Sequence, residues 1–211
     1  MTRNEIRCNA VGKGIVMMDK YTIIQNADQQ FAREVTLGVI VTRPLTVWHY
    51  IIPGFFIIDF LRRGSAIRQY TKHFMFPRKL AMDAAVTELQ GENKESISVD
   101  LKDNIRIWLE SLELYSPDLA QAHAVLIEIL AAHYLKLLNA EGDTFYLLLE
   151  HAYQHRDNFN QFIETITSAE NEVDRQVIGQ LGGEEKVKGK ILAEQQQIAK
   201  RRQKILEEVF R

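Results

Sequence analysis

The chain has 211 residues, enough for one or two domains with a sizeable buried core. Apolar residues make up 46% and charged residues 26%, which is ordinary for a globular protein and excludes a low-complexity chain. The formal net charge of −2 provides no basic face across the whole fold, so nucleic acid is not expected as a partner. The single cysteine, Cys8, cannot form a disulfide within the chain, and we expect a reducing compartment.

Region 1–38 is predicted to be helical, as one or two helices. Its apolar residues recur along the segment at Ile6, Val11, Ile15, Tyr21, Ile24, Phe31 and Val35. Two glycines, Gly12 and Gly14, weaken the start of this helix. The amino terminus lacks the apolar core of a signal peptide, so export is not expected.

Segment 39–61 is the most apolar part of the chain. Between Leu45 and Leu61 only Thr46, His49 and Asp59 are clearly polar, and Pro53-Gly54 interrupts the segment near its middle. Proline lacks an N–H and glycine accepts positive φ, so this pair favours a helical hairpin or a segment lying in a membrane interface.

Three interpretations of this segment compete. A spanning helix needs about 20 apolar residues, more than the interrupted stretch between Arg43 and Arg62 provides. A buried hairpin in the core of a soluble protein is the second. The third, which we favour, is a monotopic segment on a membrane surface, with aromatic side chains at the headgroup level. The predicted membrane contacts are Trp48, Tyr50, Ile51, Phe55, Phe56, Ile57, Arg62, Arg63 and Arg68.

The charges along the chain are strongly separated. Between Phe60 and Met82 there is no acid, and there are six cations: Arg62, Arg63, Arg68, Lys72, Arg78 and Lys79. From Asp83 to Arg175, 18 acids stand against 6 bases. A cationic zone directly after the apolar segment suits an anionic lipid surface, although a solvated helix face would have the same pattern.

Region 62–181 is predicted to be a helical bundle. Pro77 can occupy the first turn of a helix that ends near Gly91. Ser116-Pro117-Asp118 marks a helix start, with an N-cap, a first-turn proline and an acid at the positive helix end. Apolar stripes predict helices over 117–139 and 144–166, joined by a short turn and packed as an antiparallel hairpin. With four prolines and eleven glycines in the whole chain, we predict an all-α, multi-helix bundle.

Region 184–211 is predicted to be a polar amphipathic helix. Its thin apolar stripe needs a surface to dock on, which could be a protein partner or a second copy of this chain. The basic run Lys200–Lys204 is interpreted as a solvated helix face.

Four of the six histidines fall between positions 123 and 155. His151 and His155 are four residues apart, and folding the hairpin brings His133 level with them, so a metal or haem site is conceivable. The stripe positions, between leucines and phenylalanines, also suit histidines that are hydrogen-bonded inside the helix packing. We expect the second role, and therefore no metal and no cofactor.

The sequence thus predicts a non-enzymatic binding, scaffold or assembly module. It would lie on the cytoplasmic face of a membrane through segment 39–61. The alternative is a soluble helical metal- or haem-binding protein, possibly an enzyme, that uses His133, His151 and His155. No motif in the sequence identifies a substrate.

Overall fold

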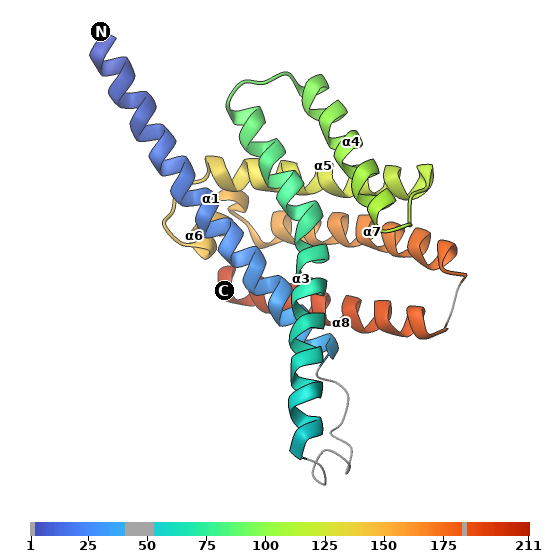
Figure 1. Cartoon of the computed structure of the whole chain (residues 1–211). Helices are drawn as coiled ribbons and strands as arrows, with labels where there is room; N and C mark the ends of the chain where they lie inside the picture. Colours follow the sequence, from blue (N-terminus) through green and yellow to red (C-terminus); the bar gives the residue numbers. More distant parts are fainter. Residues whose placement is uncertain (1–2, 41–52, 183–184) are drawn as a thin grey trace.

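The computed structural model describes the backbone of residues 3–40, 53–182 and 185–211, and the side chains of 17–39, 67–182 and most of 185–211. All regular secondary structure in this described part is helical, and the described residues between helices form short turns and loops (Figure 1). The helices, in chain order, are α1 (Arg3–Ile40), α3 (Pro53–Leu89), α4 (Lys94–Ser111), α5 (Pro117–Asn139), α6 (Phe145–Tyr153), α7 (Arg156–Gln180) and α8 (Glu185–Val209). The predicted all-α bundle is confirmed.

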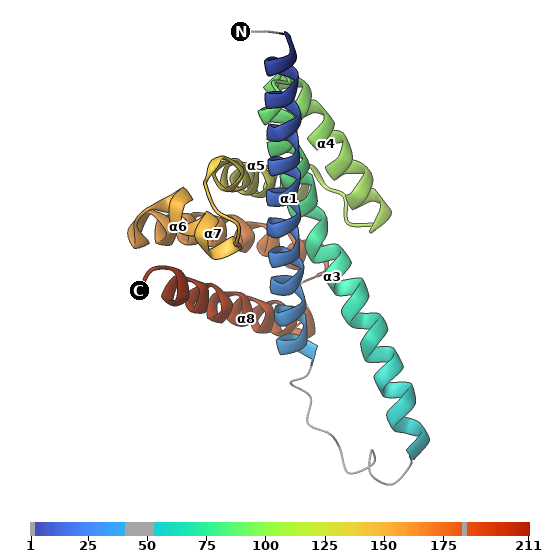
Figure 2. The ribbon, with the colours of Figure 1, turned by 90° about the vertical axis from the view of Figure 1, so that its left-hand side faces the viewer.

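Two long helices, α1 and α3, pack along each other and cross the stack formed by α5, α7 and α8 (Figures 1 and 2). Region 1–38, for which the sequence predicts one or two helices, lies from Arg3 onward in a single helix, α1, of 38 residues. In both views the first turns of α3 extend beyond the end of α1 and away from the other helices. None of the helices in the described part is long and apolar enough to cross a membrane.

Pro77 lies inside α3, so the prediction that it begins a helix is wrong. A proline in a helix interior removes one backbone hydrogen bond and costs about 3 kcal/mol. Here the helix continues because its next turns are buried, with Ala81, Met82 and Ala85 in the core against α1 and α5. The predicted end is confirmed, since α3 stops at Leu89 and Gly91 has a φ of +89°.

Helix α5 is the centre of the core and begins where the sequence predicts. The Ser116 hydroxyl accepts a hydrogen bond from the Leu119 N–H at 3.2 Å, and Pro117 occupies the first turn. Ten of its residues are buried, against α3, α4 and α7. Helix α4 contributes Ile105 and Leu109 to the same core.

The predicted helix over 144–166 is broken into α6 and α7, so this prediction is wrong. Gln154 has a φ of +61°, and α7 starts at Arg156. The Asn158 side chain donates to the Tyr153 carbonyl oxygen at 2.9 Å, which satisfies a carbonyl at the end of α6. Because of this break, α5 packs more on α7 than on α6, and the two predicted helices do not form a simple two-helix hairpin.

Helix α8 docks on the chain's own body. Its residues Ile198, Ile205 and Leu206 are buried against α1, α6 and α7. The thin apolar stripe predicted for this helix thus has an intramolecular partner surface.

Candidate functional site

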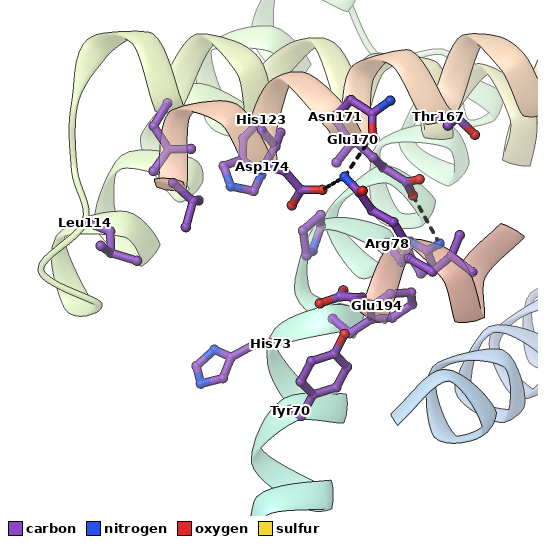
Figure 3. Close-up of a pocket in the computed structure, with 18 of the residues that line it drawn as sticks. Tyr70, His73, Arg78, Leu114, His123, Thr167, Glu170, Asn171, Asp174 and Glu194 are labelled. Carbon is purple, nitrogen blue, oxygen red and sulfur yellow. Dashed lines mark hydrogen bonds and ion pairs between the residues drawn. The ribbon is translucent and has the colours of Figure 1, made fainter. Parts of the chain in front are cut away.

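A pocket of about 300 Å³ lies among α3, α4, α5, α7 and α8 (Figure 3). One side of its wall is apolar and the other carries charge. The apolar lining is Phe74, Trp108, Leu109, Leu112, Leu114, Leu119, Leu126, Val173, Val177 and Ile198. The polar lining is Tyr70, His73, Arg78, His123, Thr167, Glu170, Asn171, Asp174, Glu194, Gln195 and Arg202. A pocket of this size and mixed lining suits a small organic ligand.

Helical spacing accounts for how these side chains meet. Glu170, Asp174 and Val177 follow one another at steps of four and three, so they share one face of α7. On α8 the spacing from Glu194 to Ile198 and Arg202 is four residues each time. The pocket therefore forms where one face of each helix converges.

The two arginines of the pocket are held in a buried ion-pair network. Arg202 bonds both carboxylate oxygens of Glu170, at 2.7 and 2.8 Å, and also donates to Thr167 at 3.0 Å. Arg78 lies 3.8 Å from Glu170 and 3.9 Å from Asp28. Both arginine side chains are only 8% exposed. Glu170 and Asp28 together thus balance the charge of the two arginines.

Arg78 also has an aromatic environment. Its guanidinium lies 4.2 Å from the ring centroid of Phe74 and 5.5 Å from that of Phe31. Such cation–π contacts stabilise a buried guanidinium. Arg78 therefore belongs to the core of the body and not to the cationic zone that the sequence indicates after residue 60.

Two further carboxylates of the pocket, Asp174 and Glu194, form no ion pair with a cation among the residues whose side chains are described. Asp174 accepts a hydrogen bond from the Gln195 side chain at 2.8 Å. Burial is the main cause that raises the pKa of both carboxyl groups, and the charge of Glu170 raises the pKa of each further. The pocket therefore contains two acidic groups that no ion pair neutralises in the described part of the chain, although the charge of Arg78 lowers the pKa of Glu194.

His123 completes the wall at the apolar end. Its ring is 6% exposed and meets Trp108 edge-on, with ring centroids 5.0 Å apart. Burial lowers the pKa of His123 to about 4, so the imidazole is neutral near pH 7. Its Nδ1 has no hydrogen-bond partner in the described part of the chain. An unpaired polar atom in a buried wall is unusual and points to a group that can bind there.

The residues predicted to contact a membrane are only partly covered by the structure. Trp48, Tyr50 and Ile51 lie outside the described residues. The backbone positions of Phe55, Phe56, Ile57, Arg62 and Arg63 belong to the first turns of α3. Arg68 is further along α3, and its side chain is exposed.

The three histidines considered for a metal are in separate environments. His133 is buried, stacks on Phe162 at 4.2 Å and has its Nδ1 2.8 Å from the Tyr153 hydroxyl. His151 is exposed and donates from Nδ1 to the Glu141 carbonyl oxygen at 2.6 Å. His155 is exposed at the start of α7. Across residues 3–40, 53–182 and 185–211, no group of three or more His, Cys, Asp or Glu side chains could hold a metal ion.

Comparison of this chain with protein-family models, curated proteins and solved structures finds no match. The pocket and the projecting part of α3 (Figure 1) are the two features of the described structure that bear on function. The pocket has no continuous signal in the sequence, because its lining residues come from five helices. A signal was present in Glu170 and Asp174, which are four residues apart, but an acidic pair on a helix is usually solvated.

The basic run Lys200–Lys204, predicted to be a solvated helix face, is not solvated along its whole length. Arg202 is buried, and Arg201 is 14% exposed and pairs with Glu34 at 2.9 Å. The interpretation of the whole run as a solvated face is therefore wrong for these two residues. Only a tertiary structure could reveal this, because their partners lie on α7 and α1.

Proposed function

We propose that this protein is a non-enzymatic binding or assembly module that attaches to the cytoplasmic face of a membrane through the start of α3 and the adjoining apolar segment. The observation that carries the proposal is the projection of the first turns of α3 beyond the other helices (Figures 1 and 2). These turns have the sequence PGFFIIDFLRR. Because these apolar turns lie outside the helical body, the body does not provide them with an apolar environment. A lipid surface provides one.

The cations that follow the first turns of α3 also support attachment of this end of the helix to a membrane. Arg68 and Lys72, one turn apart on α3, are both exposed. Each cation near an anionic surface contributes roughly 1 kcal/mol to binding. Most of the acidic residues from Asp83 onward lie in the end of α3 and in the helices that follow it, not in the first turns of α3.

The metal- or haem-binding alternative has less support. His133 and His151 each have a protein partner for Nδ1, and His155 lies at a break between helices rather than on the face of His151. We therefore do not propose it.

The proposal is tested by vesicle sedimentation of the full chain with a double variant, Phe55→Asp and Phe56→Asp. Binding to vesicles of phosphatidylcholine and phosphatidylserine should fall by at least about tenfold, while the circular dichroism spectrum remains helical. The matched control is Val99→Asp with Ile107→Asp, two apolar residues on α4 that are 59% and 60% exposed. The control should bind vesicles like the wild type.

Two results would contradict the proposal. The first is wild-type protein that remains in the supernatant with every vesicle composition. The second is a Phe55→Asp, Phe56→Asp protein that loses its helical spectrum, because the segment would then be part of a soluble core.

A further inference from the structure

The pocket in the helical body has three features that a protein interior rarely combines without a ligand. It is a hollow of about 300 Å³, its wall contains two carboxylates with no cationic partner among the described side chains, and the buried His123 Nδ1 has no hydrogen-bond partner there. In Figure 3 the side chains of His73, His123, Asp174 and Glu194 border the same hollow. These residues come from α3, α5, α7 and α8.

The charges around the hollow select the sign of a ligand. Arg78 and Arg202 are balanced by Asp28 and Glu170, at the distances given above. Asp174 and Glu194 form no ion pair with a described cation, although the charge of Arg78 lowers the pKa of Glu194. A partly buried carboxylate is costly unless it is paired. An anionic ligand would add to this excess, and a neutral one would leave it as it is. A cation would compensate it.

The rest of the wall selects the body of the ligand. Trp108, Leu114 and Val177 form part of an apolar side, and they would bury a ring or a short alkyl chain. A bare metal ion would not use this side. No group of three metal-ligating side chains occurs in the described part of the chain, so two carboxylates would have to hold it.

We infer that the pocket binds a small organic cation, an ammonium group on an aromatic or alkyl body. The ammonium group donates hydrogen bonds to Asp174 and Glu194, and these charge-assisted bonds fix its position. The apolar body packs beside Trp108, and the neutral His123 offers Nδ1 as a further acceptor. The inference is independent of membrane attachment, because the pocket lies in the body and not in the first turns of α3.

Three probes with one shape and different charge test this directly: 2-phenylethylammonium, 2-phenylethanol and 3-phenylpropionate. Each has a phenyl ring and two methylene groups, and only the end group differs. The chain has two tryptophans, so a Trp48→Phe background makes the fluorescence of Trp108 the single reporter from the pocket wall. Titration calorimetry of the full chain gives the affinities. The ammonium probe should bind at least about tenfold more tightly than the alcohol, and the carboxylate should bind least.

Substitution of the two carboxylates then locates the site. Asp174→Asn and Glu194→Gln should each weaken binding of the ammonium probe by about tenfold or more and leave the affinity for the alcohol unchanged. The control is Glu172→Gln, on α7 but outside this pocket and paired with Arg175 on the surface. Should Asp174→Asn fail to fold, Glu194→Gln alone decides.

Three outcomes would overturn the inference. Equal affinity for all three probes would show that charge has no role in recognition. Unchanged ammonium binding in both carboxylate variants would place binding elsewhere. Failure of the wild type to bind the ammonium probe, with no change in Trp108 fluorescence at saturating concentration, would show that the hollow does not bind this ligand class.

Discussion

Arg202 of α8 and Glu170 of α7 form a bidentate ion pair in which Nη1 and Nη2 of the arginine donate to the two carboxylate oxygens, at 2.7 and 2.8 Å. The Arg202 and Glu170 side chains are only 8% and 17% exposed. A bidentate pair with this burial fixes the relative position of two helices more strictly than apolar packing does. It also sets the polar end of the pocket.

We predict that the stability losses from removing the two partners of this pair are not additive. Arg202→Leu leaves the Glu170 carboxylate with only the more distant Arg78, and should lower the free energy of unfolding by about 3 kcal/mol. The double variant Arg202→Leu, Glu170→Leu should lose less than the sum of the two single variants. Urea unfolding of the four proteins measures this coupling. Additive losses would show that the two residues do not interact energetically.

A second prediction concerns acid. Burial, together with the charges of Arg78, Lys136 and Arg202, lowers the pKa of His133 to about 3. Below the unfolded-state pKa of about 6.5, the unfolded chain binds a proton that the folded chain does not. The free energy of unfolding should therefore fall as pH drops from about 6.5, by about 1.4 kcal/mol per pH unit for this residue.

The measurement is urea unfolding at about pH 7 and about pH 5 for the wild type and His133→Gln. The variant should lose less stability between the two conditions. The partly buried carboxyl groups of Asp28, Asp174 and Glu194 have raised pKa values, which act with the opposite sign, but they are common to both proteins and cancel in the comparison. A parallel decline in both proteins would contradict the prediction. His151→Gln, at an exposed position, is the control.

A third prediction concerns the cationic zone. Changing Arg62, Arg63 and Arg68 to Glu should weaken binding to anionic vesicles, with the larger effect at low salt because exposed charges are screened. The control changes three exposed cations of α4 to Glu: Lys94, Lys102 and Arg106. Co-sedimentation across a salt series provides the comparison. If the wild type binds neutral and anionic vesicles equally, these cations have no part in attachment.

Two helical glycines should respond differently to the same change. A Cβ on Gly189 of α8 would meet nothing within 4 Å, so Gly189→Ala should stabilise the protein by about 0.5–1 kcal/mol. A Cβ on Gly38 of α1 would overlap the Gln197 side chain. Gly38→Ala should therefore gain less or destabilise, and adding Gln197→Ala should restore the gain. Thermal unfolding of the three variants is the test, and equal gains at both glycines would contradict it.

Part of the fold could be predicted because local signals determine it. The Ser116-Pro117-Asp118 start of α5 depends on a cap and on proline geometry within four residues, and it is confirmed. The break at Gln154 has no such signal. It contains neither glycine nor proline, and the apolar spacing continues through it, so only the packing of Tyr153 and the contact from Asn158 produce it.

The pocket could not be predicted for a related reason. The partners of Arg202 lie more than thirty residues away, and those of Arg78 lie on α1 and α7. A sequence pattern reports the faces of one helix, whereas this pocket depends on which faces meet. The separation of charges can be read from the sequence. It puts Arg78 in the cationic zone between Phe60 and Met82, because the position of a residue in the sequence does not reveal whether its side chain is buried.

The contact between α1 and α8 has a consequence for biosynthesis. Arg201 on α8 pairs with Glu34 on α1, and Ile24, Phe31 and Val35 of α1 lie in one core cluster with Ile198 and Ile205 of α8. Residues 53–182, with the helices α3 to α7, are made between these two helices. The apolar face of α1 therefore leaves the ribosome long before α8 can cover it. During that interval it is open to association with other nascent chains or to a chaperone, and closure of the body is a late, long-range step of folding.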